Sequence, residues 1–71
     1  MEVMRMENHY VWQEVLEVDQ YGPNSFGLHV MSRSGRAYWV RTSNRELALR
    51  AREGSWVKID TRTWRPVEVR P

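Results

Sequence analysis

Few residues of this chain have the types and spacing that catalysis needs. Three carboxylates follow one another within a short segment, namely Glu14, Glu17 and Asp19, but no acid–base partner for them is evident. The chain has no glycine-rich phosphate loop and no nucleophile motif. It has no cysteine, and two histidines, His9 and His29, are too few for a metal cluster. We therefore predict a protein that is not an enzyme and uses neither a cofactor nor a metal.

Residue types suited to binding are more prominent. The chain has four tryptophans, and ten of its eleven basic residues are arginine, whose planar fork suits phosphate and stacks on bases. Residues 1–32 carry one base and five acids, whereas residues 33–71 carry ten bases and four acids. A GC-rich genome would also favour arginine over lysine, but it would not separate the charges along the chain.

Short runs rich in aromatic and β-branched residues predict that most of the chain is strand. We expect strands at residues 10–18, 26–31, 36–41, 56–59 and 64–70. A break in alternation near Gln13 and Glu14 suggests a bulge in the first strand. The competing interpretation of that segment is a helix with Val11, Val15 and Val18 on one face.

One short helix is predicted at residues 44–53. Ser43 and Glu46 have the spacing of a capping box, with Ser43 as the N-cap, and Gly54 stands where helices commonly end. Leu47, Ala48 and Ala51 would face the core. A helix of this length needs tertiary packing to persist.

The hairpin between the second and third strands fixes a register. A three-residue loop, Arg33-Ser34-Gly35, places glycine at the left-handed position that such loops require. Val30 then lies opposite Tyr38 and Leu28 opposite Val40, so that apolar residues share one face. The predicted inward residues of the strands are Phe26, Leu28, Val30, Tyr38, Val40, Val57, Ile59, Val67 and Val69. Pro66 lacks an N–H group, which indicates an edge strand or a bulge.

The order of three strands, a helix and two strands resembles the OB-fold, a five-stranded Greek-key barrel that often binds oligonucleotides. The phrase LALRAREGSWVKI also looks like the helix–glycine–strand junction of that fold. We therefore expect an all-β fold, a small OB-fold-like barrel of five antiparallel strands with one short helix between strands three and four. It would be a single domain over residues 1–71, with residues 1–8 poorly ordered. A small SH3-like barrel is the alternative. The phrase SFGLHV is faintly similar to a cold-shock strand, but the second aromatic strand of that family has no counterpart.

The predicted outward face of strands two and three is the candidate site. In the preferred register His29 lies opposite Trp39, and Gly27 lies opposite Arg41. An exposed indole beside a cation could stack on a base, while arginines neutralise phosphates. The candidate nucleic-acid-binding residues are His29, Arg33, Arg36, Trp39 and Arg41.

Two hypotheses for function remain open at this point. The first is binding of single-stranded DNA or RNA. The second is a protein-interaction module, such as a small accessory subunit or a phage-type regulator, because tryptophan and arginine are common interface anchors and the acidic first third of the chain repels phosphate. A homodimer is compatible with both. Trp12, Trp56 and Trp64 could be exposed or covered. The lack of cysteine, of an apolar span and of a secretory signal predicts a cytoplasmic protein without a membrane segment.

Overall fold

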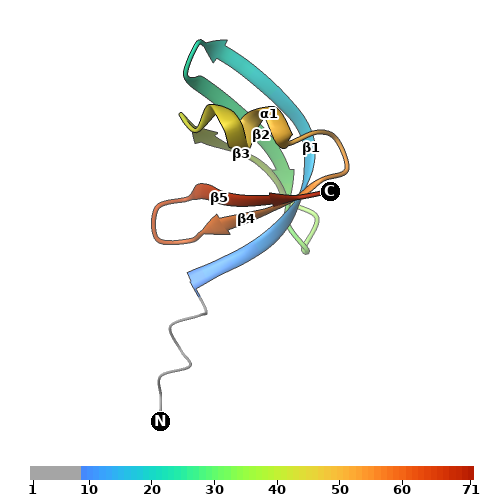
Figure 1. Cartoon of the computed structure of the whole chain (residues 1–71). Coiled ribbons are helices and arrows are strands. Elements are labelled where there is room, and N and C mark those ends of the chain that lie inside the picture. Colours follow the sequence, from blue (N-terminus) through green and yellow to red (C-terminus); the bar gives the residue numbers. More distant parts are fainter. Residues whose placement is uncertain (1–8) are drawn as a thin grey trace.

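A computed structural model of the chain describes residues 9–71, and these form one antiparallel sheet with one short helix (Figure 1). The strands are β1 (Tyr10–Gly22), β2 (Ser25–Met31), β3 (Ala37–Thr42), β4 (Trp56–Asp60) and β5 (Arg65–Arg70), and the helix is α1 (Arg45–Arg50). The all-β class, the five strands and the position of the helix between β3 and β4 are confirmed. The competing helix at the start of the chain is wrong, because that segment is the long strand β1. The expectation for residues 1–8 lies outside the described residues.

The long strand β1 lies at the centre of the sheet, whose strand order is β3-β2-β1-β4-β5. Its first half pairs with β4, from Tyr10 opposite Asp60 to Glu14 opposite Trp56, and its second half pairs with β2. The predicted bulge is present, but it lies at Leu16 between the pairs made by Val15 and Glu17. An extra residue at such a position bends a strand and increases its twist, so one strand serves two differently oriented halves of the sheet.

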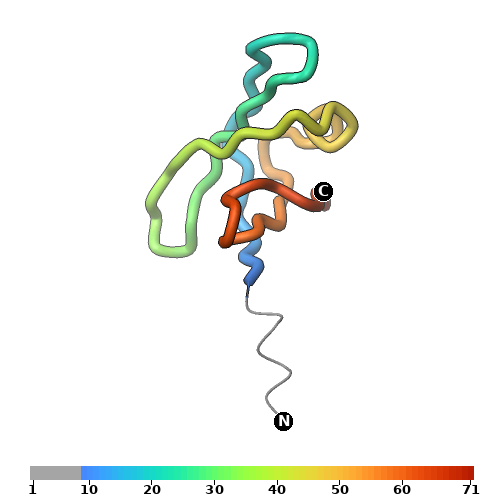
Figure 2. The backbone as a smooth tube through the Cα atoms, turned by 90° about the vertical axis from the view of Figure 1, so that its left-hand side faces the viewer, coloured from blue at the N-terminus to red at the C-terminus, as the bar shows by residue number. Residues whose placement is uncertain are grey.

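The sheet curls but does not close. The edge strands β3 and β5 approach each other, but no ladder joins them. Side chains bridge this opening instead, because the ring of Trp64 in the β4–β5 turn meets the ring of Tyr38 edge-on at 5.9 Å between centroids. Figure 2 shows the β2–β3 hairpin and the β4–β5 hairpin as separate arms of the curled sheet.

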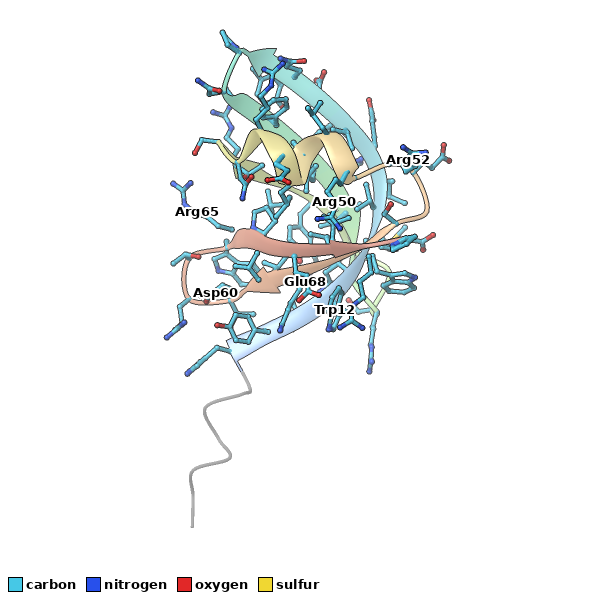
Figure 3. All side chains as sticks on the ribbon, viewed as in Figure 1. Trp12, Arg50, Arg52, Asp60, Arg65 and Glu68 are labelled. Atoms are coloured by element: carbon cyan, nitrogen blue, oxygen red, sulfur yellow. The ribbon has the colours of Figure 1, made fainter. Side chains whose placement is uncertain are left out.

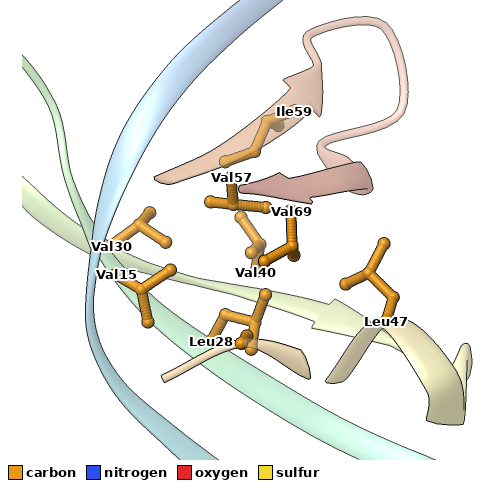
Figure 4. Packing of buried hydrophobic residues seen from close by; sticks show 9 residues of the cluster. Val15, Leu28, Val30, Val40, Leu47, Val57, Ile59 and Val69 are labelled. Carbon is orange, nitrogen blue, oxygen red and sulfur yellow. The ribbon is translucent and has the colours of Figure 1, made fainter. Parts of the chain in front are cut away.

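The core fills the concave side of the curled sheet (Figure 4). Leu28, Val30 and Val40 meet Val15 of β1 and Val57 and Ile59 of β4 there. The helix α1 packs against β2 and β5 and contributes Leu47, while Ala51 follows it into the same cluster. The predicted inward positions are confirmed with one exception. Val67 is 49% exposed, whereas Pro66 is buried, because a register shift between β4 and β5 reverses the alternation.

The helix is shorter than predicted and has a different N-cap. Its N-cap is Asn44, whose Oδ1 accepts a hydrogen bond from the Leu47 N–H at 3.1 Å. The prediction of Ser43 as N-cap is therefore wrong. The helix ends at Arg50, with Ala51 already extended, so that Gly54 does not cap it. Gly54 lies in the following turn, where φ is +92° and its N–H donates to the carbonyl of Val15.

Candidate functional site

The outward side of β2 and β3 has the register that the sequence predicts. His29 lies opposite Trp39, Gly27 opposite Arg41, and Ser32 closes the loop by donating its N–H to the Arg36 carbonyl. Gly35 has φ +90°, the left-handed conformation for which glycine is suited. The loop geometry therefore places the His29 and Trp39 side chains next to each other on the same face.

The two rings form a parallel stack. Their centroids are 4.5 Å apart and their planes differ by 8°. Trp39 is nevertheless 45% exposed, because it lies on the edge strand β3 and only His29 stacks on it among residues 9–71. Packing against His29 orients the indole and leaves its other side accessible, which is the arrangement that a flat ligand needs for stacking.

A cation–aromatic pair lies beside this stack on the same face. The Arg41 guanidinium carbon lies 5.1 Å from the centroid of the Tyr21 ring, within the range of cation–π attraction. Tyr21 reaches this position across Gly27, because a Cβ built at Gly27 would lie 2.5 Å from the Tyr21 hydroxyl oxygen. We call the set Tyr21, Gly27, His29, Trp39 and Arg41 the Trp39 face.

Sequence reasoning did not identify Tyr21 as part of this face. Gly27 is the feature that could have indicated it, since glycine inside a strand often marks the close approach of another group. The strand β1 also brings two acids to the border of the face, with Glu17 opposite His29 and Asp19 opposite Gly27. The face is consequently acidic along β1 and basic along β3.

The structure does not bring Arg33 and Arg36 into the Trp39 face. Both are exposed in the β2–β3 hairpin, and neither makes an ion pair or a cation–π contact within residues 9–71. Arg36 directly precedes β3. Arg33 instead lines a cleft between the hairpin and the first half of β1.

The remaining tryptophans form no part of the Trp39 face. Trp12 is half-buried, with the Arg70 guanidinium carbon 4.7 Å from its ring centroid, and Trp56 and Trp64 are exposed. Figure 3 shows Trp12 and Glu68 near each other beside β4 and β5. The sequence left open whether these three tryptophans are exposed or covered, and the structure shows that Trp56 and Trp64 are exposed.

The turn that carries Trp64 is held by Asp60. Its carboxylate accepts two hydrogen bonds from the Arg62 guanidinium, at 3.1 and 2.9 Å, and one from the Arg62 backbone N–H. These bonds lower the pKa of the Asp60 carboxyl below its usual value. Trp64 has φ +58°, and its N–H donates to the Asp60 carbonyl at 2.6 Å. The turn thereby imposes a left-handed conformation on a bulky residue, which is uncommon.

Comparison with known proteins adds no family to these observations. No family model, curated protein or solved structure matches the chain significantly. Among residues 9–71 no helix is long and apolar enough to cross a bilayer, and no group of three or more His, Cys, Asp or Glu side chains gathers as metal ligands would. The fold and the Trp39 face define the class to which the chain belongs, a small all-β protein with an exposed aromatic and cationic surface.

Proposed function

We propose that this chain is a non-enzymatic binding module that holds single-stranded DNA or RNA on the Trp39 face. The observation that carries the proposal is the half-exposed Trp39 ring, oriented by its stack on His29. A base that stacks on such a ring contributes about 1–3 kcal/mol, with little dependence on which base it is. This chemistry fits a ligand that carries flat rings one after another along its chain.

The arrangement of strands supports the same proposal. The order β3-β2-β1-β4-β5, with a helix between β3 and β4, is compatible with a partly open, OB-fold-like barrel. Many OB-folds bind oligonucleotides on the surface of strands two and three. Fold analogy alone does not assign function, so the proposal depends on the residues of the face.

The charges of the face indicate where a phosphate backbone would lie. Arg41 and Arg36 are exposed on the β3 side, whereas Glu17 and Asp19 occupy the β1 side. Phosphates are attracted to the first pair and repelled by the second. The bound strand would therefore follow the β3 edge toward the hairpin, with its bases directed to Trp39.

The test is binding of fluorescently labelled oligo(dT) and oligo(U), followed by anisotropy. Trp39→Ala should weaken binding by about 1–3 kcal/mol, because the stacking partner is lost. Trp56→Ala is the matched control, since Trp56 is equally exposed at 46% but lies on β4, and it should bind as the wild type does. Circular dichroism of both variants checks that they remain folded. Equal binding by Trp39→Ala and the wild type would contradict the proposal.

The salt dependence of binding tests the role of the arginines. Arg41→Ala and Arg36→Ala should each weaken binding and also reduce the slope of log K against log salt, since fewer counterions are released. Arg50→Ala, an exposed arginine in the last turn of α1, should leave the slope unchanged. An unchanged slope in Arg41→Ala and Arg36→Ala would show that the phosphates do not lie along the β3 edge.

A specific observation favours a protein ligand as the second candidate. Glu17 and Asp19 stand directly opposite His29 and Gly27, so acids on β1 border a face whose β3 side carries Trp39 and Arg41. A protein surface with bases opposite β1 and acids opposite β3 would be complementary to it. In that case the wild type binds no oligonucleotide, and Trp39→Ala weakens binding to the protein partner.

A further inference from the structure

A second surface, separate from the Trp39 face, combines a cleft with an unsatisfied polar atom. The cleft has a volume of about 530 Å³ and lies between the first half of β1 and the β2–β3 hairpin. Its lining includes Tyr10, Trp12 and Gln13 from β1 and Ser32, Arg33 and Ser34 from the hairpin. We call it the Trp12 cleft. Aromatic walls with a few polar groups are typical of a binding site.

Gln13 makes this cleft more than a surface irregularity. The residue is 7% exposed, and its side-chain oxygen has no hydrogen-bond partner among residues 9–71. Burial raises the pKa of the Tyr38 hydroxyl, and the Gln13 side chain partly opposes this rise. A buried acceptor without a partner is costly to the folded state. A ligand that donates an N–H to Gln13 Oε1 would remove this cost.

Cations hold the two aromatic residues of the cleft from the side of β4 and β5. Lys58 Nζ lies 4.7 Å from the Tyr10 ring centroid, and the Arg70 guanidinium carbon lies 4.7 Å from that of Trp12. Glu68 lies between the two cations, 3.9 Å from Lys58 and 3.3 Å from Arg70. Lys58 Nζ also lies 6.0 Å from the Trp12 ring centroid, and Arg33 lines the cleft from the hairpin.

These features favour a protein segment over a nucleic acid as the occupant. The Glu68 carboxylate already pairs with both Lys58 and Arg70, so within residues 9–71 Arg33 is the base of the cleft without an ion pair, and a run of phosphates would find one partner there. A peptide offers what the cleft lacks, namely an apolar side chain for the aromatic walls and backbone N–H groups for Gln13. Arg33, which makes no ion pair within residues 9–71, favours an acidic residue beside the apolar anchor.

We propose that the Trp12 cleft binds an extended protein segment in which an apolar anchor is flanked by acidic residues. The cleft is a second interaction surface, and it does not depend on the function proposed for the Trp39 face. A chain with both surfaces could hold a nucleic acid on β2 and β3 while it is attached to a protein through β1 and the hairpin.

The test uses the full chain, labelled with ¹⁵N, and three blocked synthetic peptides. The first has Leu-Phe at its centre with Asp and Glu on both sides, the second has Ser-Ser in place of Leu-Phe, and the third has Lys in place of every acid. Only the first should shift the amide resonances of Tyr10–Gln13 and Ser32–Ser34. Equal shifts with the lysine peptide, or none with any peptide, would overturn the proposal.

Variants separate this site from the rest of the molecule. Arg33→Glu changes only an exposed loop residue, so the variant should stay folded. Its affinity for the acidic peptide should fall about tenfold or more, whereas Arg50→Glu on α1 should leave that affinity unchanged. Trp39→Ala should bind the peptide as the wild type does. Peptide binding by this variant therefore tests the Trp12 cleft independently of the nucleic-acid proposal for the Trp39 face. Shifts of the same amides by oligo(dT), or by raising the concentration of the chain alone, would assign the cleft to a nucleic acid or to a second copy and overturn the proposal.

Discussion

At the scale of residues, the sequence predicts neighbours within a hairpin better than neighbours across the sheet. The pairing of His29 with Trp39 followed from the loop Arg33-Ser34-Gly35, because loop length determines register between adjacent strands. The contact of Tyr21 with Arg41 depends on a side chain that crosses β2 at Gly27. No local pattern encodes such a contact, since it requires the sheet to be assembled first.

The close approach at Gly27 gives a prediction for the Trp39 face. In Gly27→Ala the new Cβ would lie 2.5 Å from the Tyr21 hydroxyl oxygen, so the exposed ring must move and lose its contact with Arg41. We expect the free energy of unfolding to fall by about 0.5–1 kcal/mol, the range of an exposed cation–π contact. Gly22→Ala is the control, because its Cβ meets only Ser25 at 3.9 Å. Proton NMR of the Tyr21 ring and urea denaturation provide the two measurements, and a ring that stays in place would contradict this expectation.

The core assignment gives a second prediction at this scale. Leu28 has no exposed surface, and Leu28→Ala should lower the free energy of unfolding by about 2–5 kcal/mol because it opens a cavity. Leu49 is 60% exposed on α1, and Leu49→Ala should change that free energy by no more than about 0.5 kcal/mol. Chemical denaturation measures both. A neutral Leu28→Ala would mean that the two faces of β2 are interchanged.

At the scale of elements, the sequence locates the helix but misplaces its ends. Ser43 and Asn44 are adjacent, and both are good N-cap residues, so composition does not choose between them. The structure chooses Asn44 because β3 continues to Thr42, which pairs with Phe26 and whose hydroxyl accepts a hydrogen bond from the Asn44 N–H. Ser43 is thereby placed in the connection. The strand β5 shows the same limit. Pro66 signals the bulge there, but it does not indicate that the bulge reverses the alternation of buried and exposed residues and so exposes Val67.

The cap can be tested directly. Asn44→Ala should lower the free energy of unfolding by about 0.5–2 kcal/mol, because the Leu47 N–H loses its acceptor. Ser43→Ala should have almost no effect, since its side chain makes no hydrogen bond within residues 9–71. Thermal or urea unfolding distinguishes the two variants. A larger loss of unfolding free energy in Ser43→Ala than in Asn44→Ala would show that Ser43 is the N-cap, as the sequence suggests.

The turn between β4 and β5 predicts a dependence on pH. Because hydrogen bonds from Arg62 hold the pKa of Asp60 below its usual value, Asp60 stabilises the folded state above about pH 4 and ceases to do so as pH falls further. The difference in stability between the wild type and Asp60→Asn should therefore be largest near neutral pH and shrink in acid. Unfolding by urea across this range measures it. A difference that stays constant with pH would show that the Asp60–Arg62 contact carries no charge-dependent stabilisation.

At the scale of the whole molecule, the sheet has a central strand and two free edges. The strand β1 pairs with β4 along its first half and with β2 along its second half, and the two ladders overlap at Glu14, whereas β3 and β5 each have one hydrogen-bonded neighbour. The sequence predicts the five strands and their antiparallel order from their alternation and turns. It does not predict how far the edges close, because closure depends on the bend at Leu16 and on the meeting of Trp64 with Tyr38.

Hydrogen exchange tests the open edges. We expect slow exchange around Glu14 and Val15, where β1 has partners on both sides, and fast exchange at alternate amides of β3 and β5, whose N–H groups point away from their only neighbour. NMR-detected exchange in D₂O resolves the strands individually. Uniform protection of β3 and β5 would mean that the edges join through a ladder in solution.

The position of β1 has a consequence for the order of events during synthesis and folding. β1 is synthesised first among the strands, yet its first half pairs with β4. Tyr10 therefore cannot pair until Asp60 has been synthesised. Until then only the β1–β2–β3 meander can form, and half of β1 remains an open template for other chains. Closing so large a loop is entropically costly, and domains dominated by non-local pairs fold in about milliseconds to seconds. The strand that joins the two proposed binding surfaces is thus also the one left longest without its partner.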